Sequence, residues 1–465
     1  MAERRQESDA LGMVDLPAEA LWGSQTQRAV ENFRISGATM PREFIIALAR
    51  IKQAAAHVHK NSGELQRDVA LAIVAAAREV VDGKHDNQFP VDVFQTGSGT
   101  SSNMNVNEVI ARRASQLLCA ELNEPLHVHP NDHVNRGQSS NDVVPSAAQV
   151  AAAVAIHEQL IPALRTLRDA LEAKAVEFDG VVKVARTHLM DAVPIRLGQE
   201  FRGYVGQIDA ALQRLQRAMT DLCELPLGGT AVGTGLNASD DLAGDVCIFL
   251  YEELRLPFRE AKNHFAAQAS ADVFVQASAA LRGAALAMGK IANDIRLMAS
   301  GPRCGLGELK LAAHQPGSSI MPGKVNPVMC EMVVQVACQV VGCDAAIAAG
   351  ATGGVGSILE LSLAWPMIAF NALTQIKVLA NAADAFAGKC VATIDADAKR
   401  CAAMLEQSLA MVTALTPDIG YDRAAEIAHE AYDSGKTIRE VCKDKAILDE
   451  DRLEALLEPR RQTGQ

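Results

Sequence analysis

One segment decides the fold class: residues 205–222 read VGQIDAALQRLQRAMTDL. Its apolar residues recur at intervals of three and four, a spacing that places them on one face of an α-helix. These residues are Val205, Ile208, Leu212, Leu215, Met219 and Leu222. A second helix is predicted by the same spacing at Leu160, Leu164, Leu167 and Leu171. We expect Pro162 to kink this helix and Pro145 to lie near its start.

The composition of the 465-residue chain agrees with helices. Hydrophobic residues make up 49% of the chain and aromatic residues only 4%. Because strands favour aromatic and β-branched residues, whereas alanine favours helices, this balance predicts an all-α fold. The length exceeds what one compact core usually supports, so we expect more than one domain or an elongated helical body.

A further helix is expected to be covered on every side. Residues 332–341 read MVVQVACQVV, which is apolar almost all round a helix. Such a helix is buried within a bundle or between subunits. We therefore expect a homo-oligomer.

Glycine and proline interrupt the helical pattern at residues 97–100, 227–235 and 317–327. Near the C-terminus, Gly435 is expected to end one helix, and Thr437 with Glu440 forms the capping-box pattern that starts the next. The expected domains are residues 1–138, mostly helical, residues 139–395, a bundle of long helices, and residues 396–465, a small helical domain.

Charge and cysteine content exclude several classes of protein. The formal net charge is −12 and no basic stripe is present, so nucleic acid is a poor candidate partner. The ten cysteines include no Cys-x-x-Cys and no zinc-site spacing, which predicts reduced thiols and chemistry without a metal or cofactor. Neither a secretory leader nor a membrane span is indicated, so we expect a cytoplasmic protein.

The most specific segment is residues 317–327, which read GSSIMPGKVNP. A phosphate-binding P-loop needs four residues between its first glycine and Gly-Lys, followed by Ser or Thr. Here five residues intervene and Val325 follows the lysine, so the nucleotide-binding interpretation fails. A solvated surface loop is the ordinary alternative for a Gly-Ser-Ser sequence.

This segment resembles the signature of the fumarase/aspartase superfamily, and within it the class II fumarases. The resemblance extends to residues 95–105 (QTGSGTSSNMN), 129–132 (HPND), 139–142 (SSND), 186–189 (RTHL) and 228–235 (GGTAVGTG). It implies a lyase that adds water reversibly to fumarate, a small dicarboxylate, to give malate. It also implies the three-domain fumarase/aspartase-like fold as a homotetramer, in which long helices from four chains form a common core and three chains contribute to each active site. The blocks around positions 98, 140, 188 and 324 are expected at helix ends.

The resemblance assigns catalytic roles. Dehydrating malate removes a weakly acidic C–H proton and concentrates negative charge on the neighbouring carboxylate as an aci-carboxylate, which the site must stabilise. Ser318 is implied as the base, activated by Lys324 and by backbone dipoles of its loop. Lys324 and Asn326 are implied to stabilise the charge. His188 is implied to act through a water on the departing hydroxyl, with Glu331 holding its ring.

Substrate binding is implied for eight residues: Ser98, Thr100, Ser139, Ser140, Asn141, Thr187, Lys324 and Asn326. Asn141 or Asp142 is also suited to cap a helix, and the two interpretations are compatible because a helix N-terminus attracts anions. A second anion site is implied at His129, Asn131 and Asp132, whose ordinary alternative is a turn around Pro130. The family usually has a basic residue slightly upstream, where this chain has Leu126.

Two alternatives remain within the superfamily. An aspartate ammonia-lyase would release ammonia instead of water, and a structural protein of the kind found in lenses would not be catalytic. Ser98, Ser140 and His129 match the fumarases where aspartases tend to differ. Retention of the implied catalytic residues opposes a structural role.

Overall fold

The structure is a computed structural model that describes residues 3–122 and 127–464. Helices dominate these ranges, and their strands pair only in two-stranded sheets, so the predicted all-α fold is confirmed. The chain forms two compact units. Unit 1 is Met1–Pro162, Gln213–Gly283 and Cys338–Ala380, and unit 2 is Ala163–Leu212, Ala284–Ala337 and Asn381–Gln465.

Unit 1 contains a layer of alanine-rich helices. Helix α2 (Arg42–Ser62) packs against α3 (Arg67–Val81), α5 (Ser140–Ala155) and α8 (Leu242–Leu254), and α3 packs against α4 (Thr100–Leu122). Small buried alanines on α2 allow this close approach, among them Ala47, Ala49 and Ala54. The other elements of this part are β1 (Arg4–Asp9), β2 (Gly12–Pro17), α1 (Ser24–Asn32), η1 (Asp86–Gln88), η2 (Pro130–Val134), β5 (Glu224–Leu225), β6 (Arg259–Glu260) and α9 (His264–Ala269).

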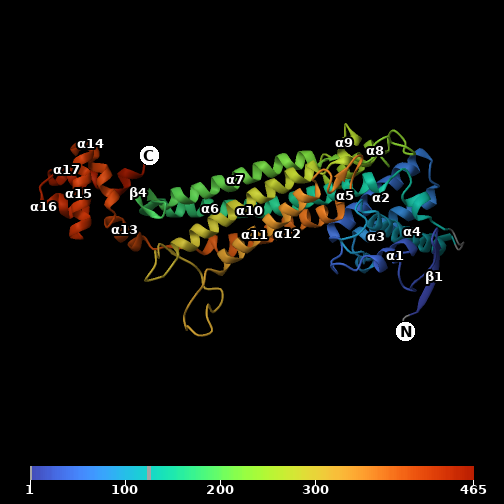
Figure 1. Cartoon of the computed structure of the whole chain (residues 1–465), viewed down its shortest axis with the longest axis horizontal. Coiled ribbons are helices and arrows are strands. Elements are labelled where there is room, and N and C mark those ends of the chain that lie inside the picture. Colours follow the sequence, from blue (N-terminus) through green and yellow to red (C-terminus); the bar gives the residue numbers. More distant parts are fainter. Residues whose placement is uncertain (1–2, 123–126, 465) are drawn as a thin grey trace. The chain divides into compact units, whose positions relative to one another are not determined.

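Long helices supply segments to both units: α7 (Leu197–Leu222), α10 (Asp272–Met298), α11 (Val328–Gly350) and α12 (Trp365–Lys389). These segments lie side by side (Figure 1). In unit 1, Ser278 of α10 hydrogen-bonds to Asp344 of α11 and to Gln375 of α12. In unit 2, Tyr204 of α7 donates to Asp294 of α10. The predicted helix at 205–222 and the predicted bundle of long helices are confirmed.

The expected irregularity near Pro162 takes the form of a π-helical turn. Helix α5 passes into η3 (Ile156–Leu160), after which α6 (Ile161–Glu177) begins. Pro162 is thus the second residue of α6 and lies two residues after the π-helical turn, the kind of irregularity that accompanies proline inside a long helix. Pro145 lies in the second turn of α5.

Unit 2 also contains a β-hairpin and the C-terminal helices. Strand β3 (Val182–Thr187) pairs with β4 (Met190–Arg196), and Val184 packs into the core of the C-terminal helices. Gly435 ends α15 in a left-handed conformation (φ 68°), and Thr437 with Glu440 caps α16, both as predicted. The remaining elements are η4 (Phe178–Gly180), β7 (Leu309–Lys310), η5 (Val391–Thr393), β10 (Asp395–Ala396), α13 (Ala398–Glu406), η6 (Leu409–Leu415), α14 (Thr416–Ile419), α15 (Tyr421–Ser434), α16 (Ile438–Asp444), α17 (Glu450–Leu456) and η7 (Pro459–Thr463). In unit 1, β8 (Ser357–Ile358) pairs with β9 (Leu361–Ser362).

Helix α11 is unusual because one chain leaves most of it uncovered. Its charged residues are Glu331 and Asp344. Only 33% of its most apolar 18-residue stretch is buried. By length and composition, α11 and the helical run from Ser140 to Gly180 could each cross a membrane. In the Ser140–Gly180 run, however, 72% of the most apolar stretch is buried inside the protein. The Ser140–Gly180 run is therefore an ordinary core helix, whereas α11 has an exposed apolar surface of the kind that packs against a partner.

Candidate functional site

A chain of hydroxyl groups joins two of the predicted binding blocks in unit 1. Ser98 Oγ lies 2.9 Å from Thr100 Oγ1, which lies 2.7 Å from Ser140 Oγ. Thr100 is the first residue of α4 and Ser140 the first of α5. A Cβ at Gly97 would lie 2.1 Å from the carbonyl oxygen of Leu363, so only glycine fits beside this turn.

The N-terminus of α5 is formed by the Ser-Ser-Asn-Asp block. Ser139 is the N-cap, and its hydroxyl accepts a hydrogen bond from the Asn141 N–H at 3.2 Å. Asp142 completes a capping box by accepting from the Ser139 N–H at 2.9 Å. The helix cap is therefore Ser139, while Asn141 donates its side-chain amide to the Ala231 carbonyl at 2.8 Å. The N–H groups and hydroxyls at this helix end suit an anion.

A cavity of about 940 Å³ lies beside this helix end within unit 1. Thr100, Ser139 and Ser140 contribute hydroxyl groups to its wall. Asn131 and Asp132 of the predicted second anion site line the same cavity. Unit 1 thus brings three of the candidate substrate-binding residues and two residues of the second site to one cavity.

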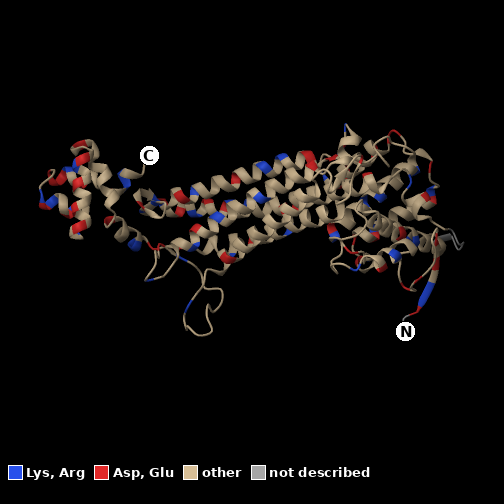
Figure 2. Cartoon of the chain, viewed as in Figure 1, with Lys and Arg blue, Asp and Glu red and all other residues tan. Residues whose placement is uncertain are grey.

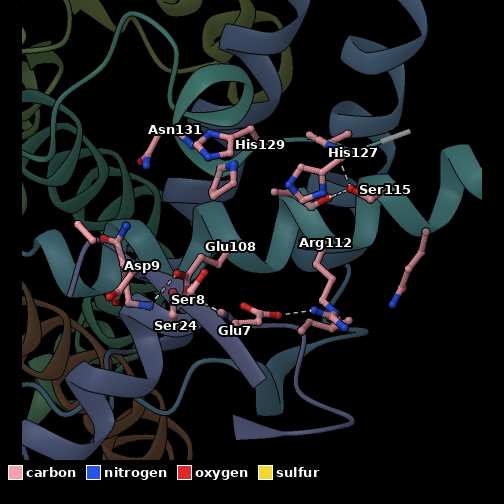
Figure 3. A pocket seen from close by; sticks show the side chains of 18 of the residues that line it. Glu7, Ser8, Asp9, Ser24, Glu108, Arg112, Ser115, His127, His129 and Asn131 are labelled. Carbon is pink, nitrogen blue, oxygen red and sulfur yellow. Dashed lines mark hydrogen bonds and ion pairs between the residues drawn. The ribbon is translucent and has the colours of Figure 1, made fainter. Parts of the chain in front are cut away.

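His129 is the N-cap of η2 and faces a neighbouring cavity of about 880 Å³ (Figure 3). Its Nδ1 accepts hydrogen bonds from the N–H groups of Asn131 and Asp132, at 3.3 and 3.1 Å, which requires that nitrogen to be unprotonated. The His129 ring therefore helps to hold the turn that begins at Pro130. Position 126, where the family usually has a basic residue, lies outside the described residues.

The cavity at His129 carries both signs of charge. Arg112 Nη1 pairs with Glu7 at 2.7 Å (Figure 3). Glu108 is buried and accepts from the Gly23, Gln25 and Thr26 N–H groups at the start of α1. Burial raises the pKa of Glu108, although these hydrogen bonds oppose the shift. Both acidic groups therefore already have partners from the protein.

In unit 2, Thr187 and His188 lie at the tip of the β3–β4 hairpin. His188 and Leu189 form its two-residue turn, and both have left-handed backbones, with φ of 55° and 63°. This is the geometry of a type I′ turn, which normally uses Asn-Gly or similar pairs. The expectation that the block around position 188 lies at a helix end was wrong. The hairpin instead presents the His188 side chain at an exposed tip.

Buried ion pairs hold the base of this hairpin. Arg186 Nη1 lies 2.7 Å from Glu308 Oε1, and Lys183 Nζ lies 3.2 Å from Glu308 Oε2 and 3.0 Å from Glu200. The Glu308 side chain is fully buried and that of Lys183 nearly so. Glu308 immediately precedes β7, which leads to the signature segment, so this cluster connects the chain leading to Ser318 with the chain leading to His188.

The signature loop between β7 and α11 is organised by its own backbone. Ser318 Oγ accepts hydrogen bonds from the N–H groups of Ile320 and Met321, at 3.2 and 3.1 Å. The Gly317 N–H donates to the Lys324 carbonyl at 2.8 Å, and the Asn326 amide donates to the Gly317 carbonyl at 2.7 Å. The loop therefore holds Ser318 among hydrogen-bond donors.

Lys324 is the only Lys, Arg, Asp or Glu between residues 311 and 330. The loop between β7 and α11 is accordingly drawn mostly in tan in Figure 2. The Lys324 side chain is exposed. Glu331 lies in the first turn of α11 and is half-buried. Among the described residues, no hydrogen bond or ion pair within one chain joins Glu331 to His188.

The candidate residues therefore fall into two groups. Ser98, Thr100 and the Ser139–Asn141 block belong to unit 1, whereas Thr187, His188 and the signature loop belong to unit 2. In residues 3–122 and 127–464, no cluster of three or more His, Cys, Asp or Glu side chains is arranged to hold a metal ion.

Known proteins resemble this chain over its whole length. A family model described as Lyase matches residues 12–342, and one described as Fumarase C C-terminus matches residues 411–464. A class II fumarate hydratase of Halobacterium salinarum is 53% identical over 459 residues, covering 99% of this chain and 97% of the relative. The chain belongs to the class II fumarate hydratase family.

Other members of the class II fumarate hydratase family agree. The relative from Ralstonia nicotianae is 49% identical over 460 residues, covering 99% of each chain. A solved class II fumarase from Schistosoma mansoni has a TM-score of 0.95 at 38% identity, with 99% of each chain covered. A structure described as fumarate lyase:delta crystallin from Brucella melitensis, bound to cobalt, has a TM-score of 0.93 at 43% identity and 100% coverage of both chains. The fumarase/aspartase-like fold is thus confirmed.

Three groups near the candidate site were missed by the sequence reasoning: Lys52, the Asp142 carboxylate as a link between loops, and the pair Arg186–Glu308. Lys52 had a signal, because it lies within the buried face of α2 beside Ile51 and Ala55. A lysine in an apolar face of a helix indicates a buried polar partner. Glu308 had no comparable signal, since its partners are more than a hundred residues away in the sequence.

Proposed function

We propose that the chain adds water reversibly across the double bond of fumarate to give L-malate. The observation that carries this proposal is the structure of the signature loop. In this loop Ser318 Oγ accepts hydrogen bonds from two backbone N–H groups, and Lys324 is the only charged side chain. The names of the relatives state the same activity. The substrate class is a small dicarboxylate.

Ser318 is the proposed base in the dehydration direction. Its oxygen, in the alkoxide form, takes the proton from C3 of malate, and the C–H electrons move into the adjacent carboxylate to give the aci-carboxylate. The N–H groups of Ile320 and Met321 lower the energy of the alkoxide because they donate to its oxygen. Lys324 and Asn326 stabilise the negative charge that accumulates on the carboxylate.

His188 is the proposed second proton-transfer group. The C2–OH bond breaks as the aci-carboxylate electrons return, and the hydroxyl leaves as water after receiving a proton through a His188-bound water. Glu331 is proposed to hold the imidazole ring. Because no contact joins these two side chains within one described chain, we propose that the Glu331 that meets a given His188 comes from another subunit.

Substrate binding is proposed for Ser98, Thr100, Ser139, Ser140, Asn141 and Thr187, together with Lys324 and Asn326. The support is the cavity shared by Thr100, Ser139 and Ser140 at the N-terminus of α5. Hydroxyl groups and a helix N-terminus bind carboxylates without adding formal charge. His129, Asn131 and Asp132 are proposed as a second anion site, supported by the presence of Asn131 and Asp132 in the same cavity.

A homotetramer with active sites shared between three chains is proposed. The uncovered apolar surface of α11 supports association through the long helices. The exposed positions of His188 and Lys324 support sites completed by other chains, because elimination chemistry requires exclusion of bulk water. A test is subunit mixing. Ser140→Ala and His188→Asn tetramers, each of low activity at fumarate concentrations far below KM, should regain activity under these conditions when dissociated and reassembled together, whereas sites built within one chain would give no gain.

Water, not ammonia, is the proposed nucleophile, since Ser98 and Ser140 match the fumarases. Purified protein should consume fumarate at the same rate with and without ammonium, and should form malate in both cases. Formation of aspartate would assign the chain to the ammonia-lyases instead.

The remaining proposals concern organisation. We propose three domains, 1–138, 139–395 and 396–465, supported at the third by the apolar core that the C-terminal helices form together with Val184. A cytoplasmic location is proposed because all ten cysteines are free thiols. Catalysis without a cofactor is proposed because the reaction needs only proton transfer and charge stabilisation.

A further inference from the structure

Lys52 is a buried lysine that donates hydrogen bonds to two neutral amides. Its side chain is fully buried on α2, and Nζ donates to Asn135 Oδ1 at 2.8 Å and to Gln138 Oε1 at 2.9 Å. In the described part of the chain, no carboxylate forms an ion pair with it. Burying an ammonium group without such a partner is costly, so a lysine is not expected here for stability alone.

The two amides that Lys52 holds lie in the wall of the candidate substrate cavity. Asn135 Oδ1 also accepts from the Asn103 and Asn107 amides, and its own amide donates to the Gln138 carbonyl at 3.1 Å. Gln138 is followed directly by Ser139, the N-cap of α5, and Ser140. The ammonium group thus fixes Asn135 and Gln138, which lie just before the N-terminus of α5.

Asp142 fixes the other side of the same helix end. Its carboxylate is fully buried and accepts from the Ser139 N–H at 2.9 Å, the Gly228 N–H at 3.1 Å and the Thr230 N–H at 3.0 Å. The Gln268 amide donates to the Thr230 carbonyl at 2.7 Å and so holds the loop that contains Gly228 and Thr230. Asp142 therefore joins the Ser-Ser-Asn-Asp block to the glycine-rich block of residues 228–235.

The two buried charges stabilise each other at long range. Burial lowers the pKa of Lys52 to about 7, and the Asp142 carboxylate opposes the shift. Burial raises the pKa of Asp142 to about 6, opposed by its backbone hydrogen bonds and by Lys52. In either protonation state Lys52 remains a hydrogen-bond donor to the two amides.

We propose that Lys52 is a positioning residue for substrate binding, which acts through Asn135 and Gln138 to fix Ser139 and Ser140 in the geometry that receives a substrate carboxylate. Asp142 holds the opposite side of that geometry. This inference rests on the proposed substrate-binding role of Ser139 and Ser140. Lys52 itself does not touch substrate.

The test is a double-mutant cycle in the full-length protein with fumarate as substrate. Lys52→Met should raise KM about tenfold and change kcat by less than about threefold, because a displaced binding group weakens ground state and transition state alike. Ser140→Ala should also raise KM. In the double variant the KM should be close to that of the more affected single variant, since both changes remove the same contact.

Ile51→Ala is the matched control, because Ile51 is fully buried on the same helix and has no polar partner. It should lower stability and leave KM unchanged. A Lys52→Met protein with an unchanged KM, or a double variant whose effects multiply, would overturn the inference. If instead Ser140→Ala leaves KM unchanged, the proposed role of Ser140 fails, which is a different result.

Hydrogen exchange keeps the test decisive if Lys52→Met is too unstable to assay. Lys52→Gln shortens the side chain but keeps an amide donor, and it should speed exchange of the Asp142 and Val143 amides while leaving those of α3 unchanged. Unaltered exchange at the start of α5, or equal acceleration in α3, would contradict a local positioning role.

Discussion

Arg186 and Glu308 form an ion pair of 2.7 Å in which the carboxylate is completely buried. Arg186 is the residue before Thr187 and His188, and Glu308 is the residue before β7, which leads into the signature loop. Within unit 2, this ion pair therefore joins the strand that leads to His188, the proposed second proton-transfer group, to the segment that leads to Ser318, the proposed base.

Removing the charge of Glu308 should be strongly destabilising. Glu308→Gln leaves Arg186 with a neutral partner and Lys183 with Glu200 alone, and breaking a buried pair in this way costs about 3–5 kcal/mol. Urea unfolding followed by circular dichroism measures the loss. Glu426→Gln, in the exposed pair with Arg423, is the control and should unfold like the parent protein. Equal stability of the Glu308→Gln and parent proteins would show that the cluster is not a structural anchor.

Ser318→Ala should nearly abolish turnover because it removes the proposed base. A loss of roughly 10²–10⁴-fold in kcat is expected for a proton-transfer group. The assembly should remain intact, as measured by light scattering. Ser319→Ala alters the next residue and should retain most of the activity. Substantial turnover by Ser318→Ala would remove Ser318 from this role.

Lys324→Met should lower kcat roughly 10²–10³-fold, because the cation stabilises charge that grows in the transition state. Steady-state kinetics separate this effect from one on binding. Lys310→Met changes an exposed lysine of β7 and should have little effect. If Lys324→Met raised KM alone, Lys324 would bind substrate uniformly and would not be catalytic.

Acid should remove a stabilising contribution of Glu79. The Arg113 guanidinium, together with His85, holds the pKa of this carboxyl at about 2 although burial opposes the shift. Because the folded-state pKa lies below the usual value of 4.5, the stabilisation is complete above about pH 4.5 and is lost as the pH falls toward 2.

The matching measurement compares Glu79→Gln with the parent protein by urea unfolding. After allowance for solvent screening, the parent should be more stable by about 1 kcal/mol at pH 7, and the difference should shrink at pH 3. A difference that grew on acidification would have the wrong sign for this pair.

Local patterns in the sequence predicted the features that depend on local physics. The three-and-four spacing of 205–222 fixes one buried face and lies within α7. Gly435 and Thr437 mark helix ends because a left-handed residue and a capping hydroxyl each act within one turn. The predicted loop at 317–327 follows from its glycines and prolines, and α11 begins directly after it.

The remaining features depend on residues far apart in the chain. The turn at His188 and Leu189 contains neither glycine nor asparagine, so its left-handed backbone leaves no sequence signal, and the hairpin was mistaken for a helix end. The link from Asp142 to Gly228 and Thr230 spans more than eighty residues. Such contacts follow from packing and not from spacing along one helix.

The central claim, water addition to fumarate by removal or return of a proton at C3, is tested most directly by proton NMR of the reaction in deuterium oxide. Fumarate incubated with the purified protein should give malate that carries one deuterium at C3, at a rate unaffected by added ammonium. Aspartate as the product in the presence of ammonium, or fumarate left unchanged, would contradict the account.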